Sequence, residues 1–128
     1  MELLHKDITN LILRTYYDVY NELGYGFLER VYQNAMCFEL EKQGLKVESQ
    51  KPIKVFYKEK LVGEYFADLL INDTVIIELK ANEVLVSANE IQLLNYLRAT
   101  NIEVGLLLNF GKKPESRRKI FTNNLKNQ

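Results

Sequence analysis

The sequence contains a single cysteine, Cys37, and no excess of either charge. One cysteine excludes an intramolecular disulfide framework and fits a reducing compartment, so we expect a cytoplasmic protein. Lysine plus arginine total 17, and aspartate plus glutamate also total 17. This balance gives no overall attraction to nucleic acid, so any such binding must come from a local patch.

Long apolar runs are also absent. No stretch approaches the length of a membrane span, and residues 1–10 contain no apolar core of signal-peptide length. We therefore expect no membrane contact. The composition, with 47% hydrophobic and 27% charged residues, is ordinary for a globular protein and argues against disorder. The length of 128 residues suits one compact domain, so we expect residues 1–128 to form it.

Three segments have the apolar spacing of amphipathic helices. Apolar residues recur at intervals of three and four over about residues 3–23, and Gly24 follows as a left-handed stop. A second helix is expected over about 27–43, before Gly44, and a third over 86–100. The sequence therefore predicts two helices before the first strand and one helix between strands.

Four segments have the composition of strands. Residues 47–58, 61–71 and 75–81 are separated by turn sequences, which predicts antiparallel hairpins. The continuous apolar run 104–109 is typical of a central strand, and its place after a helix predicts a parallel crossover. A short last strand is expected at 119–122. The prediction is an α/β fold whose mixed β-sheet, with antiparallel hairpins plus a parallel crossover strand, is flanked by helices.

Residues 68–80 contain the most informative pattern. Glu78 and Lys80 alternate with apolar residues and so share one face of a strand, and Asp68 stands ten positions earlier. A two-residue turn at 72–73 would place Asp68 and Glu78 on opposite faces, whereas a three-residue turn at 72–74 would pair them. The apolar pattern alone does not decide between the two turns, but a shared chemical role would favour the second.

Two carboxylates and a lysine are the residue types that metal-assisted phosphodiester cleavage requires. Carboxylates at one spot repel each other, and a magnesium ion removes that cost. The ion can also lower the pKa of bound water, and a neighbouring lysine can position or deprotonate that water. The alternative is a solvated strand edge with an ordinary glutamate–lysine pair worth about 0–1 kcal/mol.

Several motifs together resemble a known superfamily. Residues 64–68 and 76–81 resemble the core motif of the PD-(D/E)xK nuclease-like superfamily, and Gln92 with Tyr96 resembles the Gln-x-x-x-Tyr motif of its exonuclease-like branches. Residues 26–32 spell Gly-x-x-Glu-x-x-Tyr, which looks like the signature of the small GxxExxY proteins. The resemblance covers about residues 8–110 and implies a restriction-endonuclease-like core.

The resemblance also implies a metal site and its ligands. Asp68 and Glu78 would bind Mg²⁺ or Mn²⁺ directly, with the main-chain carbonyl of Leu79 as a third ligand. Glu29 would approach from the second helix and either join the metal site or orient its water.

Lys80 would be the catalytic lysine in the same comparison. Gln92 and Tyr96 lie one helical turn apart and so share a face, from which they would brace Lys80 or contact the substrate backbone. One position departs from the pattern, because Asn89 stands where many relatives are expected to have histidine.

These observations predict a metal-dependent phosphodiesterase acting on DNA or RNA. The rival prediction is a nuclease-fold module, weak or inactive in catalysis, that binds nucleic acid or protein. A homodimer or a protein partner that completes a groove fits either prediction.

The eight tyrosines are scattered and predict no stacking platform. The basic residues near the end of the chain form either a phosphate-contacting patch or a solvated tail: Lys112, Lys113, Arg117, Arg118 and Lys119.

Overall fold

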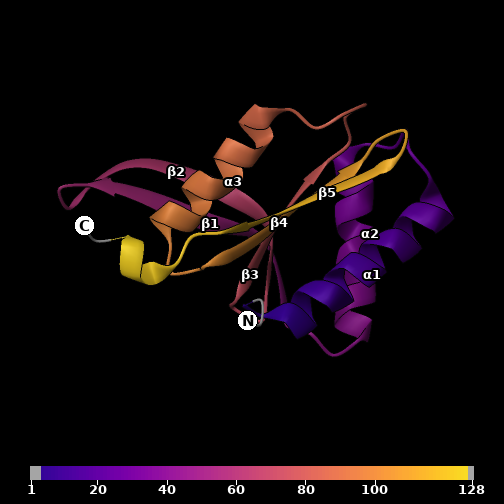
Figure 1. Cartoon of the computed structure of the whole chain (residues 1–128), viewed down its shortest axis with the longest axis horizontal. Helices are drawn as coiled ribbons and strands as arrows, with labels where there is room; N and C mark the ends of the chain where they lie inside the picture. The colour runs from indigo at the N-terminus through magenta and orange to yellow at the C-terminus, as the bar shows by residue number, and fades with distance from the viewer. Residues whose placement is uncertain (1–3, 127–128) are drawn as a thin grey trace.

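The computed structural model describes residues 4–126. Within these residues the chain forms helices and a five-stranded sheet of strand order β1-β2-β3-β4-β5 (Figure 1). The helices are α1 (Lys6–Leu23), α2 (Glu29–Lys42), α3 (Ser87–Ala99) and the short 3₁₀ turn η1 (Asn123–Leu125). The strands are β1 (Val47–Tyr57), β2 (Lys60–Ile71), β3 (Val75–Lys80), β4 (Val104–Phe110) and β5 (Pro114–Ile120). Strands β3 and β4 are parallel and the other neighbouring pairs antiparallel, which confirms the predicted mixed sheet.

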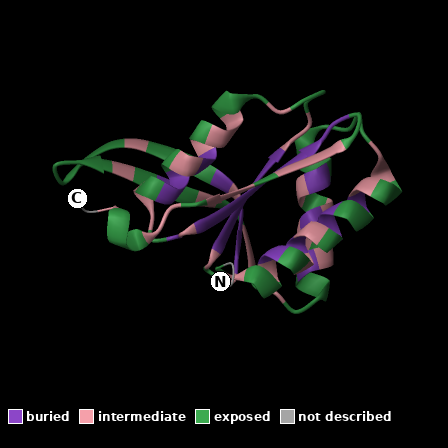
Figure 2. Ribbon diagram, in the orientation of Figure 1, coloured by how far each residue is buried: buried purple, intermediate pink, exposed green. Residues whose placement is uncertain are grey.

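The helices cover the two faces of the sheet separately. Helices α1 and α2 pack on one face, where Tyr16, Tyr32 and Met36 contact the strands, and α3 packs on the other face through Leu93 and Leu97. Strand β4 is buried along its whole length, as the continuous apolar run predicted (Figure 2). The outer part of the β1–β2 hairpin extends beyond the helix pair and is exposed.

The predicted helices are confirmed with shifted ends. Helix α1 begins at Lys6, directly after His5, whose left-handed φ of 56° prevents helical continuation; the predicted start at Leu3 lies outside the described residues. Gly24 ends α1 with a φ of 70°, and its N–H donates to the Tyr20 carbonyl at 2.8 Å. Helix α2 begins at Glu29, two residues later than predicted.

The turn between β2 and β3 has three residues, 72–74. Asn72 and Asp73 adopt left-handed φ values of 49° and 57°, which these residue types tolerate. The ladder pairs Leu69 with Ile77 and Ile71 with Val75. Continued one residue further, this register places Asp68 opposite Glu78, so the structure selects the turn that brings the two carboxylates together.

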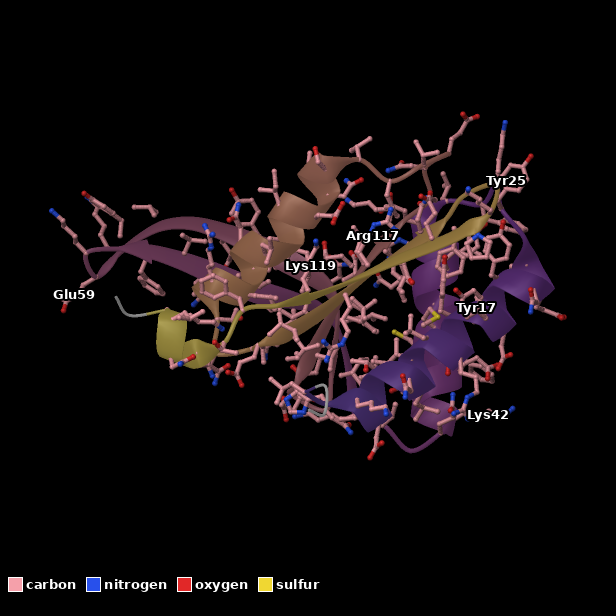
Figure 3. The ribbon with its side chains drawn as sticks, viewed as in Figure 1. Tyr17, Tyr25, Lys42, Glu59, Arg117 and Lys119 are labelled. Atoms are coloured by element: carbon pink, nitrogen blue, oxygen red, sulfur yellow. The ribbon has the colours of Figure 1, made fainter. Side chains whose placement is uncertain are left out.

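Strand β5 is longer than the predicted last strand and carries much of the basic run. Its Arg117 and Lys119 reach the Glu90 carboxylate of α3 at 3.9 and 2.6 Å (Figure 3). Lys112 approaches Glu83 at 3.6 Å. Because Lys112, Arg117 and Lys119 already face carboxylates, these three cations are less available to a phosphate chain. None of the helices in residues 4–126 is long and apolar enough to cross a membrane.

Candidate active site

Asp68 of β2 and Glu78 of β3 are fixed to each other's strand by two reciprocal hydrogen bonds. The main-chain N–H of Asp68 donates to Oε2 of Glu78 at 2.8 Å. The main-chain N–H of Leu79 donates to Oδ2 of Asp68 at 2.8 Å. Each bond involves one oxygen of a carboxylate, so the strand backbone holds both side chains in place while the acids remain adjacent.

A break in the alternation of β2 turns Asp68 toward the α3 face. Residues two apart on a strand normally share a face, yet Ala67 packs in the α3-side core and Leu69 in the core under α1 and α2. The residues after the break resume the alternation, with Leu70 on the α3 side. Glu78 lies between Ile77 and Leu79, which face α1 and α2, and therefore also points to the α3 side.

Burial makes this acid pair costly to ionise. Glu78 is only 4% exposed. Burial, together with the neighbouring charge of Asp68, raises the pKa of Glu78 to about 8. Burial also raises the pKa of Asp68, while the hydrogen bond from the Leu79 N–H and the charge of Lys80 oppose that shift. Ionisation of both carboxyls is therefore disfavoured here, and a nearby cation would offset this cost.

Lys80 is the nearby cation that the chain itself supplies. It is the last residue of β3, two positions after Glu78, and its side chain is half-buried. Its charge lowers the pKa of both Asp68 and Glu78. The structure thus places the lysine within electrostatic reach of both acids, as the Glu-x-Lys spacing predicted.

Glu29 lies at the edge of this site, after a loop that Tyr32 holds in place. The Tyr32 hydroxyl donates to the Gly24 carbonyl at 2.8 Å and accepts from the Phe27 N–H at 3.2 Å, and the Tyr32 ring stacks on Phe110 at 4.0 Å. Gly26 supplies a φ of 110° that other residues rarely adopt. The Gly-x-x-Glu-x-x-Tyr pattern therefore has a structural meaning, because it fixes the turn that ends at Glu29.

Glu29 stands outside the close carboxylate pair. Its charge raises the pKa of Glu78, which shows that it acts on the site electrostatically. Among residues 4–126, however, no three His, Cys, Asp or Glu side chains are grouped closely enough to hold a metal ion. The structure brings together Asp68 and Glu78, and a role for Glu29 in metal binding stays a prediction.

Helix α3 places Tyr96 near the acids. Tyr96 is 5% exposed, and burial together with the charges of Glu78 and Asp68 raises its pKa to about 12. Gln92 lies one turn earlier and lines a groove together with Tyr96. The Asn89 side-chain oxygen accepts from the Val86 N–H at 3.2 Å, so this residue serves the start of α3. Bracing of Lys80 by Gln92 or Tyr96 stays a prediction.

Gln50, which no sequence motif marks, also contacts the site. Gln50 lies in β1 between the pairs Ser49–Leu69 and Lys51–Ala67, and so opposite Asp68. Its φ of 52° is unusual for a strand residue other than glycine. Its amide nitrogen donates to Oε1 of Gln33 on α2 at 3.0 Å and reaches Oδ1 of Asp68 at 3.5 Å. No motif marks a glutamine for a left-handed conformation, so only the structure reveals this contact.

The segment after Lys80 is held by the end of β4. Buried Asn109 accepts from the Asn82 N–H and donates to the Asn82 carbonyl, both at 3.0 Å. At Gly111 a Cβ atom would lie 2.5 Å from the Asn82 carbonyl oxygen, so a larger residue would displace this segment. The end of β3, where Lys80 stands, is therefore supported from its parallel neighbour.

Comparison with known proteins gives one family and one similar structure. A family model described as the PD-(D/E)XK nuclease superfamily matches residues 6–120. A search of curated proteins found no match. The crystal structure of SSO0001 is similar, with a TM-score of 0.59 and 15% sequence identity over 73% of this chain and 50% of that chain. At this identity the likeness shows the fold, and the present chain spans about half the length of that chain.

Proposed function

The chain belongs to the PD-(D/E)XK nuclease superfamily, and from this premise we propose that it is a metal-dependent phosphodiesterase that cleaves DNA or RNA. The observation that carries the proposal is the reciprocal bonding of buried Glu78 and half-buried Asp68, two acids with raised pKa values beside Lys80. A structural ion pair would not need a second acid beside the buried Glu78. Within the superfamily, the pinned Gly-x-x-Glu-x-x-Tyr loop supports assignment to the GxxExxY proteins.

The donor atoms at this site fit a hard divalent cation. Carboxylate and carbonyl oxygens are the ligands that Mg²⁺ and Mn²⁺ prefer, and we assign the carboxylates of Asp68 and Glu78 and the main-chain carbonyl of Leu79 to this role. A bound ion would supply a water of lowered pKa and charge compensation on the phosphate. Glu29 is assigned to the same ion or to its water.

The remaining residues act on the water and the substrate in this proposal. Lys80 donates hydrogen bonds from its ammonium group, which positions the attacking water or stabilises charge that develops on the phosphate. Gln92 and Tyr96 hold Lys80 or the substrate backbone from the α3 side. The proposed compartment is the cytoplasm, and a homodimer or protein partner is proposed as a way to enlarge the small substrate surface.

The alternative function is a binding module with weak or absent turnover. The position of Glu29 outside the close acid pair favours it, as does the engagement of Asn89 at the start of α3 rather than at the site. Such a module would bind nucleic acid or a protein without cleaving it.

Cleavage assays separate these two functions. We expect the wild type to cleave labelled DNA or RNA with Mg²⁺ or Mn²⁺ and to lose activity with a chelator. Removing a residue that only supports a metal ligand typically lowers metal affinity or activity by about 10–100-fold. Asp68→Asn alters a ligand itself, so it should lower the cleavage rate by about a hundredfold or more. The matched control is Asp73→Asn, because Asp73 is an exposed turn residue that pairs with Lys46. Equal activity in Asp68→Asn would refute the site, and no cleavage by the wild type would favour the binding module.

A further inference from the structure

A groove of about 640 Å³ separates the β1–β2 hairpin from α3. Its lining includes Lys54, Phe56 and Tyr65 from the hairpin, and Gln92, Tyr96 and Arg98 from α3. Tyr96 joins the groove to the acid pair, because it also packs in the buried cluster that contains Ala67, the residue before Asp68. The groove therefore leads along α3 to the candidate active site.

The hairpin offers exposed aromatic surfaces to this groove. Phe56 is 60% exposed and Tyr65 is 50% exposed. The Tyr65 ring lies 5.7 Å from the ring of Tyr96, so two of the tyrosines that are scattered in the sequence meet here. Lys54, Val55 and Phe56 are consecutive residues of β1, and all three line the groove.

The charge of the groove is locally positive in a neutral chain. Lys54 and Arg98 are the charged residues of its lining, and no carboxylate is among the lining residues within the described chain. Glu64 lies opposite Lys54 across the strand pair but does not line the groove. The Arg98 guanidinium lies over the Phe121 ring at 5.2 Å, which holds it at this end of α3. The groove thus combines ring faces with cations, the two features that single-stranded nucleic acids require.

We propose that this groove binds single-stranded nucleic acid, with bases stacked on Phe56 and Tyr65 and phosphates near Lys54 and Arg98. The proposal rests on the proposed function for the acid pair to which the groove leads. Bases expose their faces only when they are unstacked, so these rings select a single strand over a duplex. Two cations alone would hold a duplex poorly, because duplex affinity depends mainly on the number of neutralised phosphates.

Binding measured without divalent ions tests the groove separately from cleavage. Fluorescent single strands of thymidine or uridine, about 12 nucleotides long, are titrated in chelator and compared with a duplex of equal length. We expect the single strands to bind at least about tenfold more tightly. Phe56→Ala and Tyr65→Ala should each weaken binding by about 5–150-fold, the range for loss of one stacked base. With two phosphate contacts, the slope of log affinity against log salt should be about −1.4.

Two controls keep this test independent of folding. Tyr57→Ala removes a neighbouring ring that is 63% exposed and does not line the groove, and it should bind as the wild type does. Tyr65→Phe keeps the ring and should restore binding. Duplex binding as tight as single-strand binding, or Phe56→Ala and Tyr65→Ala that match Tyr57→Ala, would overturn the proposal even if the enzyme cleaves. Single-strand binding through these rings without any cleavage would support it while refuting the proposed function.

Discussion

Replacing Lys80 by methionine is expected to lower the cleavage rate by about 10²–10⁴-fold, the contribution of a positioned acid–base group. Methionine keeps an unbranched chain of similar length in the half-buried site at the end of β3. Direct ligands of the proposed ion are not removed, so the protein should still bind Mn²⁺. Single-turnover cleavage and calorimetric Mn²⁺ titration measure the two properties separately.

The same substitution should also shift the pH dependence of metal binding. The charge of Lys80 lowers the pKa of Asp68 and Glu78, so its loss raises both values. Because a cation binds the ionised acids, Mn²⁺ binding by Lys80→Met should begin at higher pH than in the wild type. Lys42→Met is the matched control, since Lys42 lies at the far end of α2 from Glu29 (Figure 3). Unchanged cleavage in Lys80→Met would remove the lysine from the mechanism.

Glu78→Gln is expected to abolish cleavage and metal binding while stabilising the metal-free fold. Burial and Asp68 raise the pKa of Glu78 from its ordinary 4.5 to about 8. Between these pH values the native state binds more protons than the unfolded state, so the stability of the wild type falls as pH rises. The total loss is on the order of a few kcal/mol. Glutamine can still accept the hydrogen bond from the Asp68 N–H and carries no charge. The stability of the variant should therefore fall much less as pH rises.

Urea unfolding of metal-free protein across this pH range measures the difference. Glu48→Gln is the control, because the pKa of Glu48 is shifted in the opposite direction from that of Glu78. Hydrogen bonds from Lys51 and Lys46 lower the pKa of Glu48. That carboxylate contributes stability above its ordinary pKa and loses it as pH falls, so its removal should leave the slope between pH 6 and 8 unchanged. Parallel stability curves for Glu78→Gln and the wild type would contradict the buried-acid account.

The sequence predicted the strand positions of the site residues because these depend on neighbouring residues in the chain. Alternation of Glu78 and Lys80 with apolar residues decides which face they share, and the turn residues Asn72 and Asp73 tolerate left-handed backbone. With the three-residue turn that the structure selects, the constant sum of paired positions places Asp68 opposite Glu78. The apolar run of β4 likewise predicted a central strand.

Features that depend on long-range geometry were not predictable. The left-handed φ of Gln50 and the break in the alternation of β2 have no marker in the local sequence. The tyrosines Tyr65 and Tyr96 are distant in sequence, and only the packing of α3 against the hairpin brings them together. Spacing alone left the basic run as either a phosphate-contacting patch or a solvated tail, because its partner Glu90 lies on another element. Each of these required tertiary contacts rather than spacing.

Anomalous scattering from crystals soaked in Mn²⁺ tests the central claim most directly. The account predicts a peak that contacts the carboxylates of both Asp68 and Glu78 at about 2.0–2.3 Å, with Lys80 adjacent to the site. It also predicts that this peak disappears in equally soaked crystals of Glu78→Gln. An Mn²⁺ peak that avoids this pair of acids, or one that persists unchanged in Glu78→Gln, would contradict the claim that the pair is a metal centre.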